Sequence, residues 1–196
     1  MSEPARKKAT YEDVLNAPDH RIAEVIDGEL YTLPRPGPRH ATAASGITID
    51  VGAFGRRKRN DDSRMGWRIL AEPELHLAEQ IVVPDVAGWR RERMPDLPRE
   101  AFFTLPPDWI CEVISPRTAR IDRTSKKRIY AKHGIEWLWL VDPVVRTLEV
   151  LQIAGQFWQE VQLFSGDERI GPMPFEGLEI DLSLWWDGAS DDVLEE

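Results

Sequence analysis

Two carboxylates and a lysine in the middle of the chain are of the types needed for metal-assisted hydrolysis of a phosphodiester. Asp85 follows Pro84 inside an apolar segment. Glu112 is the one charge in the apolar run 109–114, and Lys126 lies in a helical pattern. Carboxylates hold Mg²⁺ or Mn²⁺ ions that compensate phosphoryl charge and activate water, while a lysine beside them stabilises developing charge or orients the nucleophile. Such residues occur in most proteins, so whether these three form a site depends on the helices and strands that position them.

Glu112 is the most informative of these residues. The run 109–114 reads WICEVI, which is typical of a strand buried on both faces. A lone carboxylate there costs free energy unless it is paired, protonated or bound to a metal. Cys111 in the same run is expected in the core, and it has no second cysteine for a disulfide.

The N-terminal part predicts a short helical turn over 11–17 and then a hairpin. Asp27-Gly28 between the apolar runs 22–26 and 30–33 is a hairpin signal. Glu24 lies in the first of these runs and has two interpretations. It is either a solvated charge or a carboxylate of the site.

A helix is predicted for residues 40–59, after a proline-rich loop at 34–38, although its glycines weaken the pattern. His40 at its start is either structural or in contact with a substrate. The basic end at 56–59 either complements the negative end of the helix dipole or contacts phosphate.

Residues 67–77 and 80–89 read as two β segments, followed by a long irregular loop at 90–107. Pro84 removes a ladder donor from the second segment, which indicates an edge, a bulge or a bend. A bend there presents the Asp85 carboxylate away from the regular ladder.

A second helix is predicted for residues 122–133, with Gly134 as its C-cap. Intervals of three and four residues share one helix face. The residues on the face of Lys126 are Asp122, Ile129, Tyr130 and His133. Lys127 points about 100° away, so it is the weaker candidate for the site. Two plainer interpretations remain open, in which Asp122 caps the helix and Lys126 is solvated.

Composition and length favour one domain at 11–186 and an acidic, frayed tail at 187–196. The 196 residues are 42% hydrophobic, enough for one core of ordinary size. Three β segments after the second helix, over 136–142, 147–153 and 156–164, complete a mixed α/β fold with one central sheet. No apolar run is long enough to span a membrane, and the N-terminus lacks a signal peptide, so we expect no membrane partner and a cytoplasmic protein.

The net charge of −9 argues against a nucleic-acid partner, but its distribution weakens that argument. Residues 167–196 hold ten acids against one arginine, so the remainder of the chain is neutral. Within that remainder, residues 117–132 carry seven cations and one acid. This strip suits a phosphate backbone, with Arg123 and Lys127 as candidate substrate-binding residues beside His40.

Four blocks of the sequence resemble the Uma2 family (DUF820) of restriction-endonuclease-like proteins, and the likeness extends over residues 11–186. The blocks are AEVIDGEL at 23–30, VPDV at 83–86, CEVISP at 111–116 and GIEWLWLVDP at 134–143, with Asp122, Lys126 and Tyr130 between the last two. The resemblance implies the PD-(D/E)xK nuclease fold, a mixed central sheet flanked by helices with a Mg²⁺-dependent site. It identifies Asp85 and Glu112 as the metal ligands.

The chain departs from the general motif at one position. The motif lysine stands two residues after the acid, where this chain has Ile114. The resemblance implies that Lys126 supplies the ammonium from the following helix, and it adds Glu24 and Tyr130 to the catalytic set. We therefore expect an endonuclease that hydrolyses phosphodiester bonds of nucleic acid, with DNA favoured over RNA as its substrate.

The alternative belongs to another class of protein. A weak or inactive nuclease-fold module would bind nucleic acid through the basic helix, or a protein through the tryptophan-rich C-terminal part. Eight tryptophans, several of them paired in sequence, are compatible with a homodimer face, although a buried core is their commoner location. Metal-dependent hydrolysis that requires Asp85 and Glu112 distinguishes the two classes.

Overall fold

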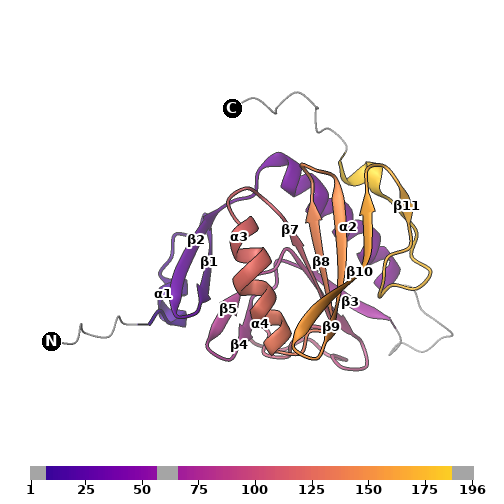
Figure 1. Ribbon diagram of the computed structural model, residues 1–196. Coiled ribbons are helices and arrows are strands. Elements are labelled where there is room, and N and C mark those ends of the chain that lie inside the picture. Colours follow the sequence, from indigo (N-terminus) through magenta and orange to yellow (C-terminus); the bar gives the residue numbers. More distant parts are fainter. Residues whose placement is uncertain (1–7, 57–65, 187–196) are drawn as a thin grey trace, which may run out of the picture.

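The computed structural model describes residues 8–56 and 66–186 (Figure 1). Its helical elements are α1 (Tyr11–Leu15), α2 (Pro38–Gly55), α3 (Ala119–Ile121), the π-helical turn η1 (Asp122–Lys126), α4 (Lys127–Lys132) and the 3₁₀ turn η2 (Leu182–Trp185). Its strands are β1 (Arg21–Ile26), β2 (Glu29–Pro34), β3 (Trp67–Ala71), β4 (Leu75–Leu77), β5 (Gln80–Val82), β6 (Val86–Arg90), β7 (Trp109–Val113), β8 (Trp137–Asp142), β9 (Thr147–Ala154), β10 (Phe157–Ser165), β11 (Arg169–Ile170) and β12 (Ile180–Asp181).

A six-stranded mixed sheet forms the centre, in the order β10-β9-β8-β7-β6-β3. Only β7 and β8 pair in parallel within it, and the chain between them forms α3, η1 and α4. A parallel pair needs such a crossover, which here covers one face of the sheet while α2 covers the other (Figure 1). The structure therefore confirms the expected mixed α/β fold with a central sheet flanked by helices.

A second sheet of four strands, β2-β1-β5-β4, stands beside the first. Its β1–β2 hairpin has the expected turn, because both Asp27 and Gly28 adopt positive φ angles of 54° and 80°. Two positive φ angles fit a type I′ turn, which suits an Asp-Gly pair. Residues 83–85 carry the chain from β5 in this sheet to β6 in the central sheet.

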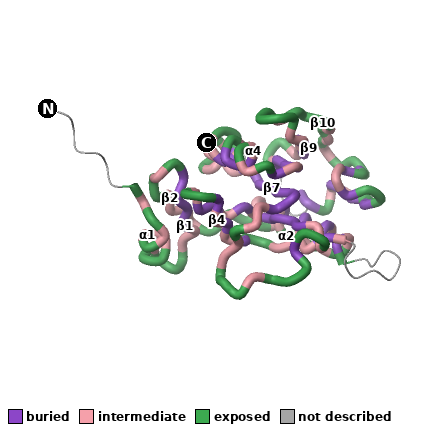
Figure 2. The backbone as a smooth tube through the Cα atoms, turned by 90° about the horizontal axis from the view of Figure 1, so that it is seen from below, coloured by how far each residue is buried: buried purple, intermediate pink, exposed green. Residues whose placement is uncertain are grey.

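The core lies on both faces of the central sheet, and the buried residues concentrate in its inner strands (Figure 2). Helix α2 contributes Ala43, Ile47 and Val51 to one face, and α4 contributes Ile129 and Tyr130 to the other. Strand β7 is buried along its whole length, as its nearly continuous apolar sequence predicted. Cys111 is accordingly buried and free.

Several predicted boundaries differ from the structure. Helix α2 ends at Gly55, four residues before the predicted end, and positions 57–59 of the basic cluster lie outside the described residues. The two segments predicted at 67–77 and 80–89 form four strands that divide between the two sheets. The helical crossover begins at Ala119, so Asp122 lies inside it and does not cap it. The acidic tail at 187–196 also lies outside the described residues.

The tryptophans do not form an exposed face. Seven of the eight are buried, and Trp158 is partly buried. Trp109 and Trp139 pack edge to face with Phe175 at the centre of one core, and Trp185 donates a hydrogen bond to Asp50 on α2. The tryptophan-based protein-binding face is therefore wrong, and the homodimer remains a prediction. Among the described residues, no helix has the length and apolar character to cross a membrane.

Two glycines of α2 should respond in opposite ways to replacement by alanine. A Cβ at Gly46 would stand 2.7 Å from the fully buried Trp185 ring, whereas nothing lies within 4 Å of a Cβ at Gly52. We expect Gly46→Ala to lower the free energy of unfolding by about 1–3 kcal/mol through overpacking. We expect Gly52→Ala to raise it by about 0.5–1 kcal/mol, because alanine favours the helix interior. Urea unfolding measures both, and stabilisation by Gly46→Ala would contradict this packing.

Candidate active site

Asp85 occupies the point where the chain passes between the two sheets. Strand β6 pairs with β7 so that Val86 lies opposite Cys111, and one further step of that register places Asp85 opposite Glu112. The Asp85 Oδ2 atom accepts a hydrogen bond of 2.7 Å from the Val113 backbone N–H. The bend predicted at Pro84 thus fixes the Asp85 carboxylate across the end of β7.

Lys126 is the centre of a buried cluster of charges. Its Nζ atom lies 2.9 Å from Glu24 Oε1, 3.2 Å from Glu112 Oε1 and 3.6 Å from Asp122 Oδ1. The Lys126 residue is only 3% exposed, so the solvated interpretation is wrong. Both Asp122 and Lys126 belong to the π-helical turn η1, a kind of turn that is frequent at functional sites.

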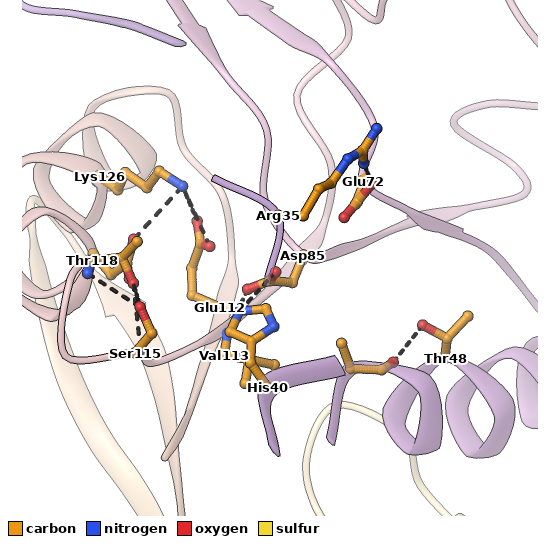
Figure 3. A network of polar contacts seen from close by, with 12 residues as sticks. Arg35, His40, Thr48, Glu72, Asp85, Glu112, Val113, Ser115, Thr118 and Lys126 are labelled. Carbon is orange, nitrogen blue, oxygen red and sulfur yellow. Dashed lines mark hydrogen bonds and ion pairs between the residues drawn. The ribbon is translucent and has the colours of Figure 1, made fainter. Parts of the chain in front are cut away.

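Glu112 joins this cluster to the Asp85 side of the site. Figure 3 shows its side chain between Lys126 and Asp85, at the end of β7. The Tyr130 hydroxyl, on α4, donates a short hydrogen bond to Glu112 Oε1. Because Lys126 and Tyr130 both contact it, the Glu112 carboxylate is paired, which is what a buried acid requires.

Glu24 reaches the same cluster from β1 in the second sheet. It is fully buried, so it is not a solvated charge. Its Oε1 atom accepts a 2.7 Å hydrogen bond from the Val83 N–H, two residues before Asp85. Its Oε2 atom is buried and has no hydrogen-bond partner among the described residues. The segment 83–85 therefore positions one carboxylate directly and a second through its backbone.

His40 lies beside Asp85 in the first turn of α2. Its Nε2 atom is 3.2 Å from Asp85 Oδ1, and its Nδ1 atom is buried with no partner in the described part of the chain. Burial lowers the pKa of His40, but the hydrogen bond to Asp85 and the negative charges of Asp85 and Asp122 together raise the pKa above its ordinary value. The structure thus places His40 against a proposed metal ligand, at the edge of the site.

The electrostatics of the cluster follow from an excess of buried acids. Burial raises the pKa of Glu112 well above its ordinary value, with the Lys126 ammonium opposing the shift, and burial also raises the pKa of Asp122. Burial lowers the pKa of Lys126, but Glu112 and Glu24 outweigh it and hold that pKa well above its usual range. Lys126 therefore stays charged, while Glu112 and Asp122 favour a proton or a nearby cation.

The remaining predicted residues lie outside the cluster. Arg123 forms a 2.8 Å ion pair with Glu149 on β9, and Lys127 is partly exposed and forms no ion pair among the described residues. Asp122 was missing from the predicted set of catalytic residues, although it is nearly as buried as Glu112. The sequence feature that could have identified Asp122 was its i, i+4 spacing from Lys126. An Asp at the start of a helix that serves only as its N-cap would look the same in the sequence.

The donors present fit a hard divalent cation. No group of three or more His, Cys, Asp or Glu side chains in the described ranges has metal-site spacing. Mg²⁺, however, is commonly bound by one or two carboxylates together with waters and substrate phosphate. Asp85 and Glu112 supply two carboxylates from opposed positions, and the unpartnered Glu24 oxygen lies nearby. Three buried acids around one ammonium also leave negative charge that a divalent cation would compensate.

Removal of the Lys126 ammonium should destabilise the fold, because the buried acids would lose their positively charged partner. We expect Lys126→Met to lower the free energy of unfolding by about 3–5 kcal/mol near pH 8, because buried carboxylates lose their partner. Near pH 5 the loss should be smaller. Burial raises the pKa values of Glu112 and Asp122 in the folded protein, so these acids bind more protons when folded than when unfolded, and the free energy of unfolding rises as the pH falls. Urea unfolding in a metal chelator measures both, with Lys127→Met as the control. A loss that does not depend on pH would contradict the charge cluster.

Comparison with known proteins shows which family this chain belongs to. The family model Uma2, described as "Putative restriction endonuclease", matches residues 9–183. A crystal structure described as a "putative nuclease belonging to DUF820" from Anabaena variabilis ATCC 29413 is similar, with a TM-score of 0.72 and 22% identity over 91% of this chain and 97% of that one. At this identity the likeness concerns the fold, and no curated protein matches the chain. Because the family model covers most of its length, the chain belongs to the Uma2 family.

Proposed function

We propose that this protein is a metal-dependent endonuclease that hydrolyses phosphodiester bonds of nucleic acid, with DNA as the preferred substrate over RNA. The observation that carries the proposal is the juxtaposition of Asp85 and Glu112 across β6 and β7, with the charged Lys126 in contact with Glu112. The family description as a restriction endonuclease supports nucleic-acid hydrolysis as the reaction.

Asp85 and Glu112 are the proposed ligands of Mg²⁺ or Mn²⁺. When bound, the cation supplies compensation of phosphoryl charge and activation of water. The two carboxylates already accept hydrogen bonds, Asp85 from Val113 and Glu112 from Tyr130. A carboxylate has about four lone-pair sites, so these bonds orient the side chains and leave sites for a cation.

Lys126 is the proposed electrostatic catalyst. Its ammonium keeps its charge because the surrounding carboxylates raise its pKa, so it can stabilise negative charge that develops on the phosphoryl oxygens. Burial and Glu112 raise the pKa of Tyr130 well above its ordinary value, so the phenol stays protonated and continues to hold Glu112. Glu24 also contacts the ammonium, at 2.9 Å, from strand β1, and helps to position it.

Substrate contacts are proposed for His40, Arg123 and Lys127, which surround the cluster from α2, η1 and α4. Arg117 and Lys127 form no ion pair among the described residues, so their charges are available to phosphate. Phosphate contacts of this kind fix the register of a nucleic acid and make its binding dependent on salt.

The direct test is cleavage of supercoiled plasmid, single-stranded DNA and RNA with Mg²⁺ or Mn²⁺. We expect wild-type cleavage, strongest on DNA, that disappears with chelator and in the double variant Asp85→Ala/Glu112→Ala. A folded wild-type protein that binds these substrates without turnover under any condition would favour the nucleic-acid-binding module instead.

Glu112→Ala should weaken Mn²⁺ binding at least about tenfold, because one of two carboxylate ligands is lost. Isothermal titration calorimetry of the full chain measures the affinity, and circular dichroism checks the fold. Glu136→Ala is a control at a partly exposed acid directly before β8, where it pairs with Arg90, and it should leave Mn²⁺ affinity unchanged. Unchanged Mn²⁺ affinity in Glu112→Ala would remove Glu112 as a ligand.

Lys126→Ala should lower kcat by about 10²–10³-fold, the usual loss on removing one charge-stabilising donor. Lys127→Ala should raise KM modestly and leave kcat almost unchanged, because its side chain is outside the cluster. Plasmid-nicking kinetics at saturating Mg²⁺ separate the two effects, provided that both variants are folded at the assay temperature. Equal losses in kcat would contradict a distinct role for Lys126.

A further inference from the structure

A pocket of about 430 Å³ opens directly beside the proposed metal ligand Asp85. One wall is α2, including Ala41, Ala44 and Thr48, and the opposite wall is formed by Ala71 at the end of β3 and by Glu72 after it. Figure 3 shows His40 and Thr48 along α2, with Asp85 and Glu72 across from them. The volume falls in the range of small-molecule sites, so it suits one nucleotide unit and not a duplex.

The chemistry of the lining favours a flat, neutral group over a phosphate. No lysine or arginine lines the pocket, and much of its wall consists of small apolar side chains from α2. Its two carboxylates, Asp85 and Glu72, are hydrogen-bond acceptors. Thr48 donates its hydroxyl proton to the Ala44 carbonyl at 2.7 Å, so toward a ligand its oxygen is left as an acceptor. A nucleobase has apolar faces and N–H donors at its edge, which match this lining.

The outer wall of the pocket is held in an unusual conformation. Glu72 has a φ of 45°, in the left-handed region that residues other than glycine rarely adopt, and such strain tends to occur at functional sites. Its backbone N–H donates a 2.9 Å hydrogen bond to the Asp85 carbonyl, which ties this wall to the proposed metal ligand. Its carboxylate forms a 3.5 Å ion pair with Arg35 from the proline-rich loop. A cation therefore stands at the rim of the pocket, outside its lining.

We propose that this pocket is a subsite for one unstacked nucleotide next to the scissile bond, with the base against α2 and a flanking phosphate at Arg35. The inference rests on the proposed function, because Asp85 would place the scissile phosphate at one end of the pocket. A base in an intact duplex is stacked and paired, so it cannot enter unless it is flipped out, at a cost in free energy. The favoured substrate is therefore single-stranded or locally unpaired nucleic acid.

The test measures binding of fluorescein-labelled single-stranded DNA and of the matched duplex to the full chain, with Ca²⁺ in place of Mg²⁺. Ala41→Leu fills the pocket from an exposed position of α2, and Ala53→Leu is the matched control on the same helix outside the lining. We expect wild type to bind the single strand about tenfold or more tightly than the duplex. Ala41→Leu should remove that preference, and Ala53→Leu should keep it.

The outcomes separate this subsite from the nuclease activity. Equal binding of single strand and duplex, no binding of either, or equal effects of Ala41→Leu and Ala53→Leu would overturn the subsite. The expected binding pattern without any cleavage in Mg²⁺ or Mn²⁺ would support nucleotide binding in the pocket and reject the nuclease, and with it the place of the pocket beside a scissile bond. Metal-dependent cleavage with unchanged affinity in Ala41→Leu would reject the subsite alone.

Discussion

The structure depends on the neutralisation of buried charge. Glu24, Glu112 and Asp122 surround the single ammonium of Lys126, and all four residues are almost inaccessible to solvent. Taking charges out of water costs several kcal/mol for each ion, and a pair recovers this only when hydrogen bonds satisfy its remaining groups. One ammonium does not match three acids. The site is therefore suited to a further positive charge, such as the divalent cation of the proposed nuclease.

The arrangement of the sheets explains how these charges come together. Residues 83–85 connect the second sheet to the central one. In this short segment the Val83 N–H donates a hydrogen bond to Glu24, and the Asp85 carboxylate accepts one from the Val113 N–H. The parallel pair β7–β8 requires a crossover, and its π-helical turn delivers Lys126 and Asp122 above the end of β7. Two sheets and one crossover thus converge on one point, which no element could form alone.

Local patterns in the sequence predicted the parts of the fold that depend on short-range physics. The Asp-Gly pair at 27–28 predicted a hairpin turn, because these residues tolerate the positive φ angles of a type I′ turn. The apolar run at 109–113 predicted the buried strand β7. The end of α2 and the start of the crossover helix were misplaced. Helix ends depend on packing against residues that are distant in the sequence. The same dependence explains Gly46 inside α2, where the close approach of Trp185 and not backbone freedom accounts for the glycine.

The sequence alone determined which residues were chemically costly: an acid in a buried strand, a proline that breaks a ladder before Asp85, and a lysine on the face of a helix. It also carried the family blocks whose resemblance the family model confirmed. Only the tertiary structure decided which of these charges meet. Glu24 and Lys126 are about a hundred residues apart and lie in contact because two separate sheets pack around one crossover. Asp122 shares a helix face with Lys126 at i, i+4, and only the structure shows that this face is buried in the cluster. The apolar run of β7 predicted that Glu112 is buried. Which charges pair across separate sheets depends on long-range packing, which local sequence patterns do not encode.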